Sequence, residues 1–141
     1  ELNRCRRDGT YLSLAISDVD YFKEVNDRYL HTIGDKVLIR LAETLNDEIR
    51  DIDYVARWGG EEFAVLITNS ELEIAREASE RMRERIATTL FDDLVEDMKI
   101  TVSIGVASSY DYADHSSLLV AADKALYQAK SDGRNRVESK P

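Results

Sequence analysis

The sequence DYVARWGGEEFAVLI, residues 53–67, contains two short apolar stretches separated by a pair of glycines. Residues 53–58 and 61–67 have the composition of strands, and Gly59 and Gly60 lie between them. Because the tight turns of antiparallel hairpins favour residues that tolerate a positive φ, a Gly-Gly connection predicts a hairpin with a two-residue turn. The other predicted elements can be placed on either side of this hairpin.

Upstream of the hairpin, the sequence predicts one strand and two helices. Residues 11–17 (YLSLAIS) alternate between apolar and polar side chains, as in a half-buried strand. Residues 22–30 have the pattern of a short helix. A longer helix opens at Gly34 and ends around Arg50, because its apolar residues recur at helical spacing.

Downstream of the hairpin, the pattern predicts two helices, a buried strand and an edge strand. These are a helix over 70–89, a strand over 99–108, a helix over 116–131 that is capped by Gly133, and an edge strand over 135–137. Ser70 followed by Glu73 resembles a capping box at the first of these helices. Residues 91–98 are the least regular part, a loop with a short strand.

The order of the predicted elements is β-α-α-β-β-α-β-α-β, which contains a βαββαβ core. That core is the ferredoxin-like arrangement, so the expected fold class is α+β, with a central antiparallel sheet flanked by helices. The chain has 141 residues, which suits a single domain over residues 1–141. Residues 1–10 resemble the tail of an upstream helix, so we expect a domain cut from a longer, regulated protein.

Composition excludes some classes of protein. The net charge of −9 makes the chain a poor candidate for binding a nucleic-acid backbone, because such binding needs clustered Lys and Arg side chains. Cys5 is the only cysteine, which favours a reducing compartment, the cytoplasm. No apolar run approaches the roughly 20 residues of a membrane-spanning helix, and no signal peptide is visible. Attachment of the full-length protein to a membrane by an upstream segment stays open.

Four acidic residues lie where the predicted strands end or begin. Asp18 and Asp20 follow the first strand and share one face, because the side chains of a strand alternate. Glu61 and Glu62 follow the glycine pair and are expected to point to opposite faces. If the first strand lies beside the hairpin, Asp18 and one glutamate converge into a set of oxygen ligands that Mg²⁺ prefers. The alternative is that these acids are solvated, although their mutual repulsion favours a bound cation.

Beyond the hairpin, several stretches form an ordered set of motifs. They are DVDYFKEVND at 18–27, IGDKVL at 33–38, RWGGEEF at 57–63, TVSIGVA at 101–107 and ADKALYQAKSDGRNRV at 122–137. Together they resemble the GGDEF family, the diguanylate cyclases. The resemblance covers nearly the whole chain, from about Leu12 to Val137, and it implies a ferredoxin-like, palm-type domain.

For the metal and the reaction, the resemblance implies roles for the acidic residues. Asp18 and Glu61 would bind Mg²⁺ or Mn²⁺, with help from the backbone carbonyl of Val19 and with two ions in each active site. Glu61 and Glu62 would be the catalytic carboxylates, and Asp20 would support them. The sequence does not divide the roles between Glu61 and Glu62.

Asn26 and Asp35 match the pair of residues with which the family binds guanine. A carboxylate can accept hydrogen bonds from the N1–H and the N2 amine of guanine, and adenine offers no such N1 donor. Asp35 therefore favours GTP over ATP as substrate. The alternative is that Asp35 caps the helix that opens at Gly34. Leu30 replaces a glycine that is usual in the family, so the wall of the pocket is expected to differ.

The resemblance assigns the phosphates of GTP to cations and backbone N–H groups. Lys23, with the N–H groups around Tyr21 and Phe22, would hold the terminal phosphates. Lys130 and Arg134 would reach the phosphates as well. The alternative for these last two cations is that they only stabilise the C-terminal end of a helix through its dipole.

The implied reaction condenses two GTP molecules into cyclic di-GMP and pyrophosphate. One domain holds one GTP, so a homodimer is part of the implied mechanism, and an upstream sensory or regulatory domain would control it. Arg50 and Asp53 form an RxxD pair at the spacing of the family's product-inhibition site, and Arg81 fits the further arginine of such sites. The alternative for the pair is an ordinary ion pair at a helix end.

Two other functions stay open. One is a catalytically silent module that binds GTP or cyclic di-GMP, and the other is an interaction domain in a longer signalling chain. Because binding alone does not need two adjacent carboxylates, the presence of both Glu61 and Glu62 favours an enzyme.

Overall fold

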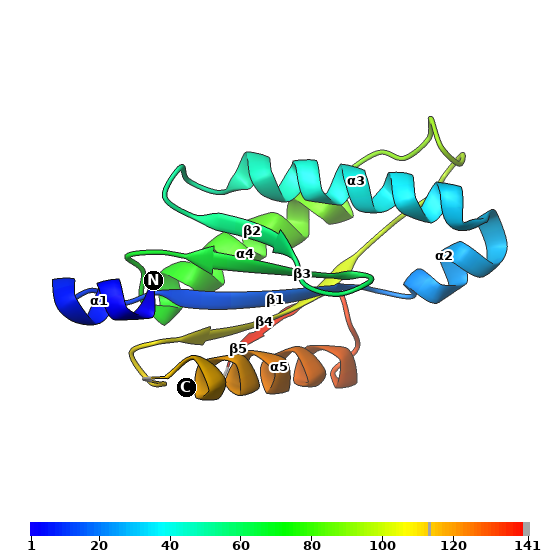
Figure 1. Ribbon diagram of the computed structural model, residues 1–141. Coiled ribbons are helices and arrows are strands. Elements are labelled where there is room, and N and C mark those ends of the chain that lie inside the picture. The colour runs from blue at the N-terminus through cyan, green and yellow to red at the C-terminus, as the bar shows by residue number, and fades with distance from the viewer. Residues whose placement is uncertain (113, 140–141) are drawn as a thin grey trace.

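The computed structural model describes residues 1–112 and 114–139 of the chain. Figure 1 shows one sheet with helices on both faces. The helices are α1 (Leu2–Asp8), α2 (Phe22–Tyr29), α3 (His31–Glu48), α4 (Leu72–Ala87) and α5 (His115–Ser131). The strands are β1 (Ser13–Val19), β2 (Tyr54–Arg57), β3 (Glu62–Ile67), β4 (Val102–Ser108) and β5 (Val137–Ser139). Within the described residues, the helices all lack the length and apolar character needed to cross a membrane.

The strands form one sheet in the order β2-β3-β1-β4-β5. The strand β1 is antiparallel to both β3 and β4, β2 is antiparallel to β3, and β5 runs parallel to β4. The predicted ferredoxin-like α+β fold is confirmed, since β1 to β4 and the helices between them form the βαββαβ core. The first strand also lies beside the hairpin, which is the arrangement that brings Asp18 close to the glutamates.

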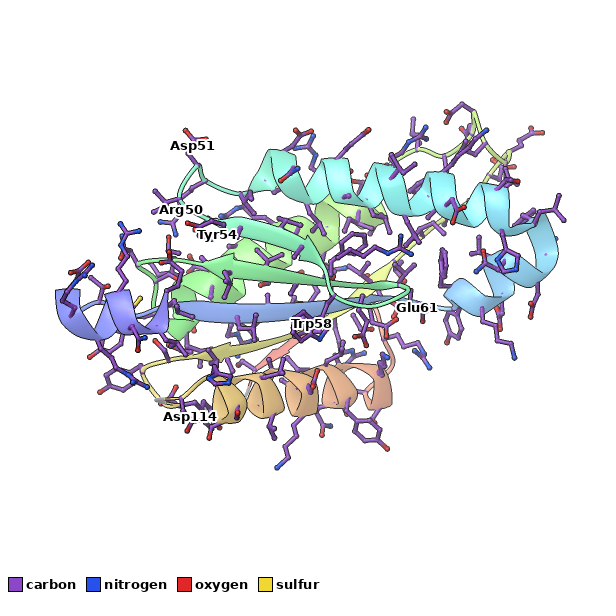
Figure 2. The ribbon with its side chains drawn as sticks, in the orientation of Figure 1. Arg50, Asp51, Tyr54, Trp58, Glu61 and Asp114 are labelled. Carbon is purple, nitrogen blue, oxygen red and sulfur yellow. The ribbon has the colours of Figure 1, made fainter. Side chains whose placement is uncertain are left out.

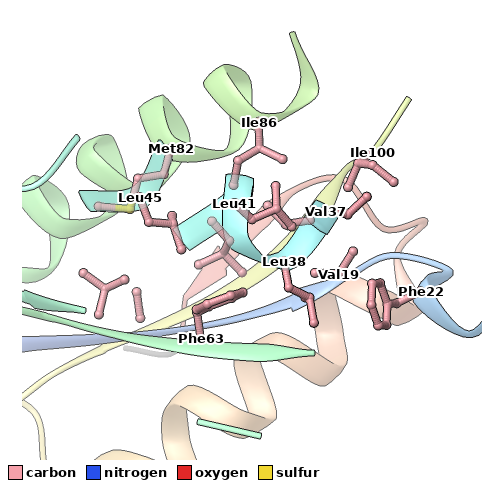
Figure 3. Packing of buried hydrophobic residues seen from close by; sticks show 14 of the residues in the cluster. Val19, Phe22, Val37, Leu38, Leu41, Leu45, Phe63, Met82, Ile86 and Ile100 are labelled. Carbon is pink, nitrogen blue, oxygen red and sulfur yellow. The ribbon is translucent and has the colours of Figure 1, made fainter. Parts of the chain in front are cut away.

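Two apolar clusters, one on each face of the sheet, hold the helices in place. The larger cluster lies under α3 and α4, and Figure 3 shows Leu41, Phe63 and Met82 within it. The smaller cluster lies under α1 and α5. The helix α5 packs directly on β4 because residue 105 is glycine: a Cβ at Gly105 would stand 2.1 Å from the backbone nitrogen of Leu126. This close packing positions the C-terminal end of α5 beside the end of β1.

The long helix α3 begins earlier than the sequence predicts. It starts at His31 rather than at Gly34, and its N-cap is Leu30. Leu30 has φ 82° and ψ 156°, a region of backbone conformation that favours glycine, and it makes no side-chain capping bond. Because Asp35 lies within the helix rather than at its start, the alternative that Asp35 caps α3 is wrong.

The predicted hairpin forms, but its turn differs from the prediction. The strand β2 ends at Arg57 and β3 begins at Glu62, so the connection is longer than the glycine pair. Neither Gly59 nor Gly60 has a positive φ. The carbonyl of Glu62 accepts hydrogen bonds from the N–H groups of Trp58 and Gly59 instead, which closes a wider loop.

The helix α4 begins without the predicted capping box. Its N-cap is Glu71, and the hydroxyl of Ser70 donates to the carbonyl of Ile67 at 3.0 Å rather than capping the helix. Residues 91–98 form turns and contain no strand. The remaining predicted elements form, with their ends shifted by a few residues.

Candidate active site

The C-terminal end of β1 carries Asp18, which lies where β1, β3, β4 and α5 meet. Asp18 faces Glu62 on β3 and Ser103 on β4 in the register of the sheet. Its side chain is only 8% exposed, and the Nζ of Lys130 lies 2.6 Å from its Oδ2. A charge-assisted bond therefore joins the end of β1 to the last turn of α5.

Glu61 and Glu62 both interact with Asp18, so the prediction that they point to opposite faces is wrong. Burial raises the pKa of Glu61, and a hydrogen bond and repulsion with Asp18 raise it further, against the attraction of Lys130. Burial and the charge of Asp18 likewise raise the pKa of Glu62. The prediction fails because Glu61 lies in the loop before β3, where the alternation of a strand does not apply. Figure 2 shows Glu61 at the tip of the hairpin.

The chemistry of this carboxylate group suits a divalent cation. In residues 1–112 and 114–139, no group of three or more Asp, Glu, His or Cys side chains is already arranged to hold a metal ion. The side chains that interact with Asp18 are oxygen donors, and their pKa values are raised by burial first and by the hydrogen bonds and negative charge of Asp18 second. A divalent cation would remove that repulsion, and Mg²⁺ and Mn²⁺ prefer oxygen ligands.

Asp20 is buried, with 4% of the residue exposed, and its carboxylate connects three segments of the chain. Its Oδ1 accepts a hydrogen bond from Ser103 Oγ at 2.6 Å. Its Oδ2 accepts from Thr101 Oγ1 at 2.7 Å and from the N–H of Asn135 at 2.9 Å. The residue therefore fixes the loop after α5 to the ends of β1 and β4. The sequence predicted a supporting role for Asp20, but these hydroxyl and backbone partners belong to no motif.

The sequence predicted no role for Arg57. In the structure, its side chain lies over the hairpin loop. Its Nε donates to the carbonyl of Gly59 at 3.2 Å, and its guanidinium also donates to the carbonyl of Gly60. These bonds hold the loop from which Glu61 projects. A loop held by hydrogen bonds keeps the side chains that project from it in fixed positions, which a catalytic role would need.

Asn26 on α2 and Asp35 on α3 are brought together by the close packing of their helices. A Cβ at Gly34 would lie 2.0 Å from Asn26 Oδ1, so the amide occupies the space that a side chain at position 34 would fill. Asp35 is the next residue in α3 and is exposed. The two candidates for guanine recognition therefore lie on adjoining turns of neighbouring helices.

The candidate phosphate-binding residues lie at the N-terminal end of α2 and the C-terminal end of α5, which Figure 1 shows at the same end of the sheet. Phe22 is buried and Lys23 is exposed. The first N–H groups of a helix have no partner within it, which favours an anion there. The guanidinium carbon of Arg134 lies 4.8 Å from the centre of the Tyr21 ring. Lys130, by contrast, is paired within the carboxylate group.

Arg50 and Asp53 form an ion pair of 3.1 Å beyond the end of α3. Burial opposes the ionisation of Asp53, but hydrogen bonds from Arg50 and from the N–H of Thr68 hold its pKa below the usual value. Arg50 also donates to the carbonyl of Thr68, so the pair has the form of an ordinary structural link. Arg81 on α4 lines a groove together with Glu48, the last residue of α3. Figure 2 shows Arg50 at the far end of β2 from Glu61.

Comparison with known proteins identifies relatives over nearly the whole chain. The sequence pattern of the family described as "Diguanylate cyclase, GGDEF domain" matches residues 1–136. Diguanylate cyclase DosC of Escherichia coli strain K12 is 40% identical over 139 residues, which are 98% of this chain and 30% of DosC. The chain therefore spans less than a third of the length of that relative.

Solved structures give the same relationship. The active GGEEF domain of a diguanylate cyclase from Vibrio cholerae matches with a TM-score of 0.90 and 34% identity, over 99% of this chain and 88% of that one. The GGDEF domain of DgcB from Caulobacter crescentus, in complex with c-di-GMP, matches with a TM-score of 0.89 and 31% identity, over 97% and 82%. The chain belongs to the GGDEF domain family of diguanylate cyclases.

Proposed function

We propose that this domain is a diguanylate cyclase, which condenses two GTP molecules into cyclic di-GMP and two pyrophosphates. The observation that carries the proposal is the Asp18 carboxylate at the end of β1, which is bonded to Lys130 and lies close enough to Glu61 and Glu62 to help raise the pKa of both. Membership of the GGDEF family supports the same reaction.

The proposed reaction is a phosphoryl transfer. The 3′-hydroxyl of one GTP attacks the α-phosphorus of the other, and the bond to pyrophosphate breaks as the new P–O bond forms. Glu62 is proposed to take the proton of the hydroxyl, because its raised pKa makes it a stronger base than an ordinary carboxylate. Asp18, Glu61 and the carbonyl of Val19 would hold Mg²⁺ or Mn²⁺, two ions in each site, which when bound would stabilise the attacking and leaving oxygens.

Guanine is proposed to bind between α2 and α3. The carboxylate of Asp35 can accept from guanine N1–H and N2, while the amide of Asn26 offers both a donor and an acceptor to the purine edge. This pairing would exclude adenine, which lacks the N1 donor. The phosphates are assigned to Lys23, Lys130, Arg134 and the backbone N–H groups around Tyr21 and Phe22.

Ring closure requires two GTP molecules that face each other, and one domain offers one guanine site. We therefore propose a homodimer as the active form. Relatives such as DosC are much longer than this chain, which supports an additional sensory or regulatory domain in the full-length protein. Cytoplasmic action fits a GTP-dependent reaction, and the acidic chain needs no nucleic-acid partner.

Product inhibition is proposed at Arg50 and Asp53. The side chain of Arg50 is 49% exposed, so its guanidinium can reach a ligand, and its fork of donors suits phosphate or a guanine edge. Cyclic di-GMP would then replace the carbonyl of Thr68 as a partner of Arg50. Arg81 is assigned to the same site on the family resemblance alone.

The test is to incubate the domain at high concentration with GTP and Mg²⁺ and to measure cyclic di-GMP and pyrophosphate. The parent should form both, and Glu61→Gln should form neither, because it removes a charge with little change of shape. Glu77→Gln, on the exposed face of α4, is the matched control and should keep full activity. A silent binding module would instead bind GTP and form no product even when two domains are forced together.

A further inference from the structure

The ring of Tyr21 and the guanidinium of Arg134 form a stack between two segments that are far apart in the sequence. The guanidinium carbon lies 4.8 Å from the ring centre, within the range of a cation–π contact. Tyr21 precedes α2, whereas Arg134 follows α5. Tyr21 is 57% exposed, so the contact is made at the surface and is not a consequence of core packing.

The backbone fixes both partners of the stack. Tyr21 and Arg134 have φ values of 56° and 66°, in the left-handed region that non-glycine residues rarely adopt. The N–H of Arg134 donates to the carbonyl of Ala129 at 2.9 Å. The next N–H, of Asn135, donates to Asp20, the neighbour of Tyr21. The loop that carries Arg134 is thus attached directly to the residue before the ring.

Arg134 has no carboxylate partner among the residues that the structure describes, since the ion pairs of residues 1–112 and 114–139 do not include it. The chain has a net charge of −9, so the lack of a carboxylate partner is not due to a shortage of acidic residues. An aromatic face holds a guanidinium in place while leaving its N–H donors free for an anion. The stack therefore orients the cation without neutralising it.

We infer that Tyr21 is a positioning residue, whose ring holds Arg134 over the N-terminal end of α2, where the phosphates of GTP would bind. The inference rests on the proposed function, because it concerns the phosphate side of the same site. It assigns a role to the aromatic ring of Tyr21, in addition to the backbone contact implied by the family resemblance. The ring acts through Arg134 and needs no contact with the nucleotide.

A double-mutant cycle tests this role. The affinity of a non-hydrolysable GTP analogue is measured by calorimetry for the parent, Tyr21→Leu, Tyr21→Phe, Arg134→Ala and the variant that combines Tyr21→Leu with Arg134→Ala. Tyr21→Leu should weaken binding by roughly two- to fivefold, the effect of one exposed cation–π contact. Tyr21→Phe keeps the ring and should bind like the parent. In the Arg134→Ala background, Tyr21→Leu should have no further effect.

Guanosine, which has no phosphate, provides the control ligand, and its binding should be the same in the parent and in Tyr21→Leu. Thermal unfolding of each variant checks that the fold is intact. The inference is overturned if Tyr21→Leu weakens the analogue equally in both backgrounds, or if it weakens guanosine as well. If the parent does not bind the GTP analogue, the proposed function itself is overturned. If the parent binds the analogue but the effects of the two substitutions are additive, only the role of Tyr21 is overturned.

Discussion

Gly34 places the amide of Asn26 beside Asp35, because only glycine leaves room for it. In Gly34→Ala the new Cβ would lie 2.0 Å from Asn26 Oδ1, so the amide must turn away. The fold should tolerate this change, since the severe clash is with the end of a movable side chain, the ring of Phe22 at 3.1 Å must shift only slightly, and alanine favours a helix by about 1 kcal/mol over glycine. GTP affinity should fall about tenfold, which is the effect of losing roughly one hydrogen bond.

The measurement is GTP affinity by calorimetry, together with the free energy of unfolding. Because the substitution acts through the amide, Gly34→Ala should have little effect when Asn26→Ala is already present. An equal loss of affinity in both backgrounds would contradict the role given to Gly34.

Leu30 holds a backbone conformation that is costly for any residue with a side chain. Its φ is 82° and its ψ is 156°, and its side chain is 72% exposed, so packing does not repay the strain. Leu30→Gly should therefore raise the free energy of unfolding by about 1 kcal/mol. Chemical denaturation measures the change.

Ile39→Gly, at a 60% exposed position inside α3, is the control and should lower stability by about 1 kcal/mol. A loss of stability in both variants would be inconsistent with strain at Leu30.

Local signals in the sequence, acids at strand ends and a glycine pair, pointed to the candidate carboxylates, whereas the candidate guanine and phosphate residues were named only through the family resemblance. The pairing of Lys130 with Asp18 could not be predicted, since it depends on how closely α5 packs on the sheet. The bracing of the hairpin by Arg57 was also missed, because a bond from a side chain to a loop carbonyl leaves no pattern in the sequence.

Among the elements, periodicity predicted the existence and order of the main helices and strands. The start of α3 was missed because its N-cap is a strained leucine, which is not a residue that signals a helix start. The capping box at Ser70 failed for a different reason, since Glu71 rather than Ser70 is the N-cap of α4 and the Ser70 hydroxyl bonds to the carbonyl of Ile67 in the preceding strand. The positions at which helices and strands end depend on such tertiary contacts, whereas their apolar faces follow directly from the periodicity of the sequence.

The connection between α3 and β2 depends on the ionised form of Asp53. Hydrogen bonds from Arg50 and Thr68 outweigh burial and hold its pKa below the value in the unfolded chain, about 3.9. The stability that Asp53 contributes is therefore fully present above that value and is lost as the pH falls through the lower pKa of the folded state. Asp53→Asn should lower the free energy of unfolding at neutral pH, and the difference from the parent should shrink below about pH 4.

Urea denaturation across this range of pH is the measurement. Asp51→Asn serves as the control, because Asp51 is an exposed neighbour of the pair, and it should change stability little at any pH. If the difference between the parent and Asp53→Asn grew as the pH fell, the direction assigned to the Asp53 pKa would be wrong.

At the scale of the whole molecule, the candidate carboxylates and the two residues proposed to bind guanine lie at the same end of the sheet (Figure 1). The proposed reaction consumes two GTP molecules, so each domain supplies half of the reacting centre. The sequence predicted this requirement through the family resemblance, but neither the sequence nor the structure of one chain contains the contact between two copies.

The most direct measurement is the rate of cyclic di-GMP formation per domain as the domain concentration increases, at saturating GTP and Mg²⁺. If two domains join their half-sites, the rate per domain should rise with concentration and level off when the dimer is saturated. Glu61→Gln should stay inactive throughout. If no cyclic di-GMP formed at any concentration, the assignment as a diguanylate cyclase would be contradicted. If the rate per domain stayed constant down to the lowest measurable concentration, a weakly associating dimer would be contradicted.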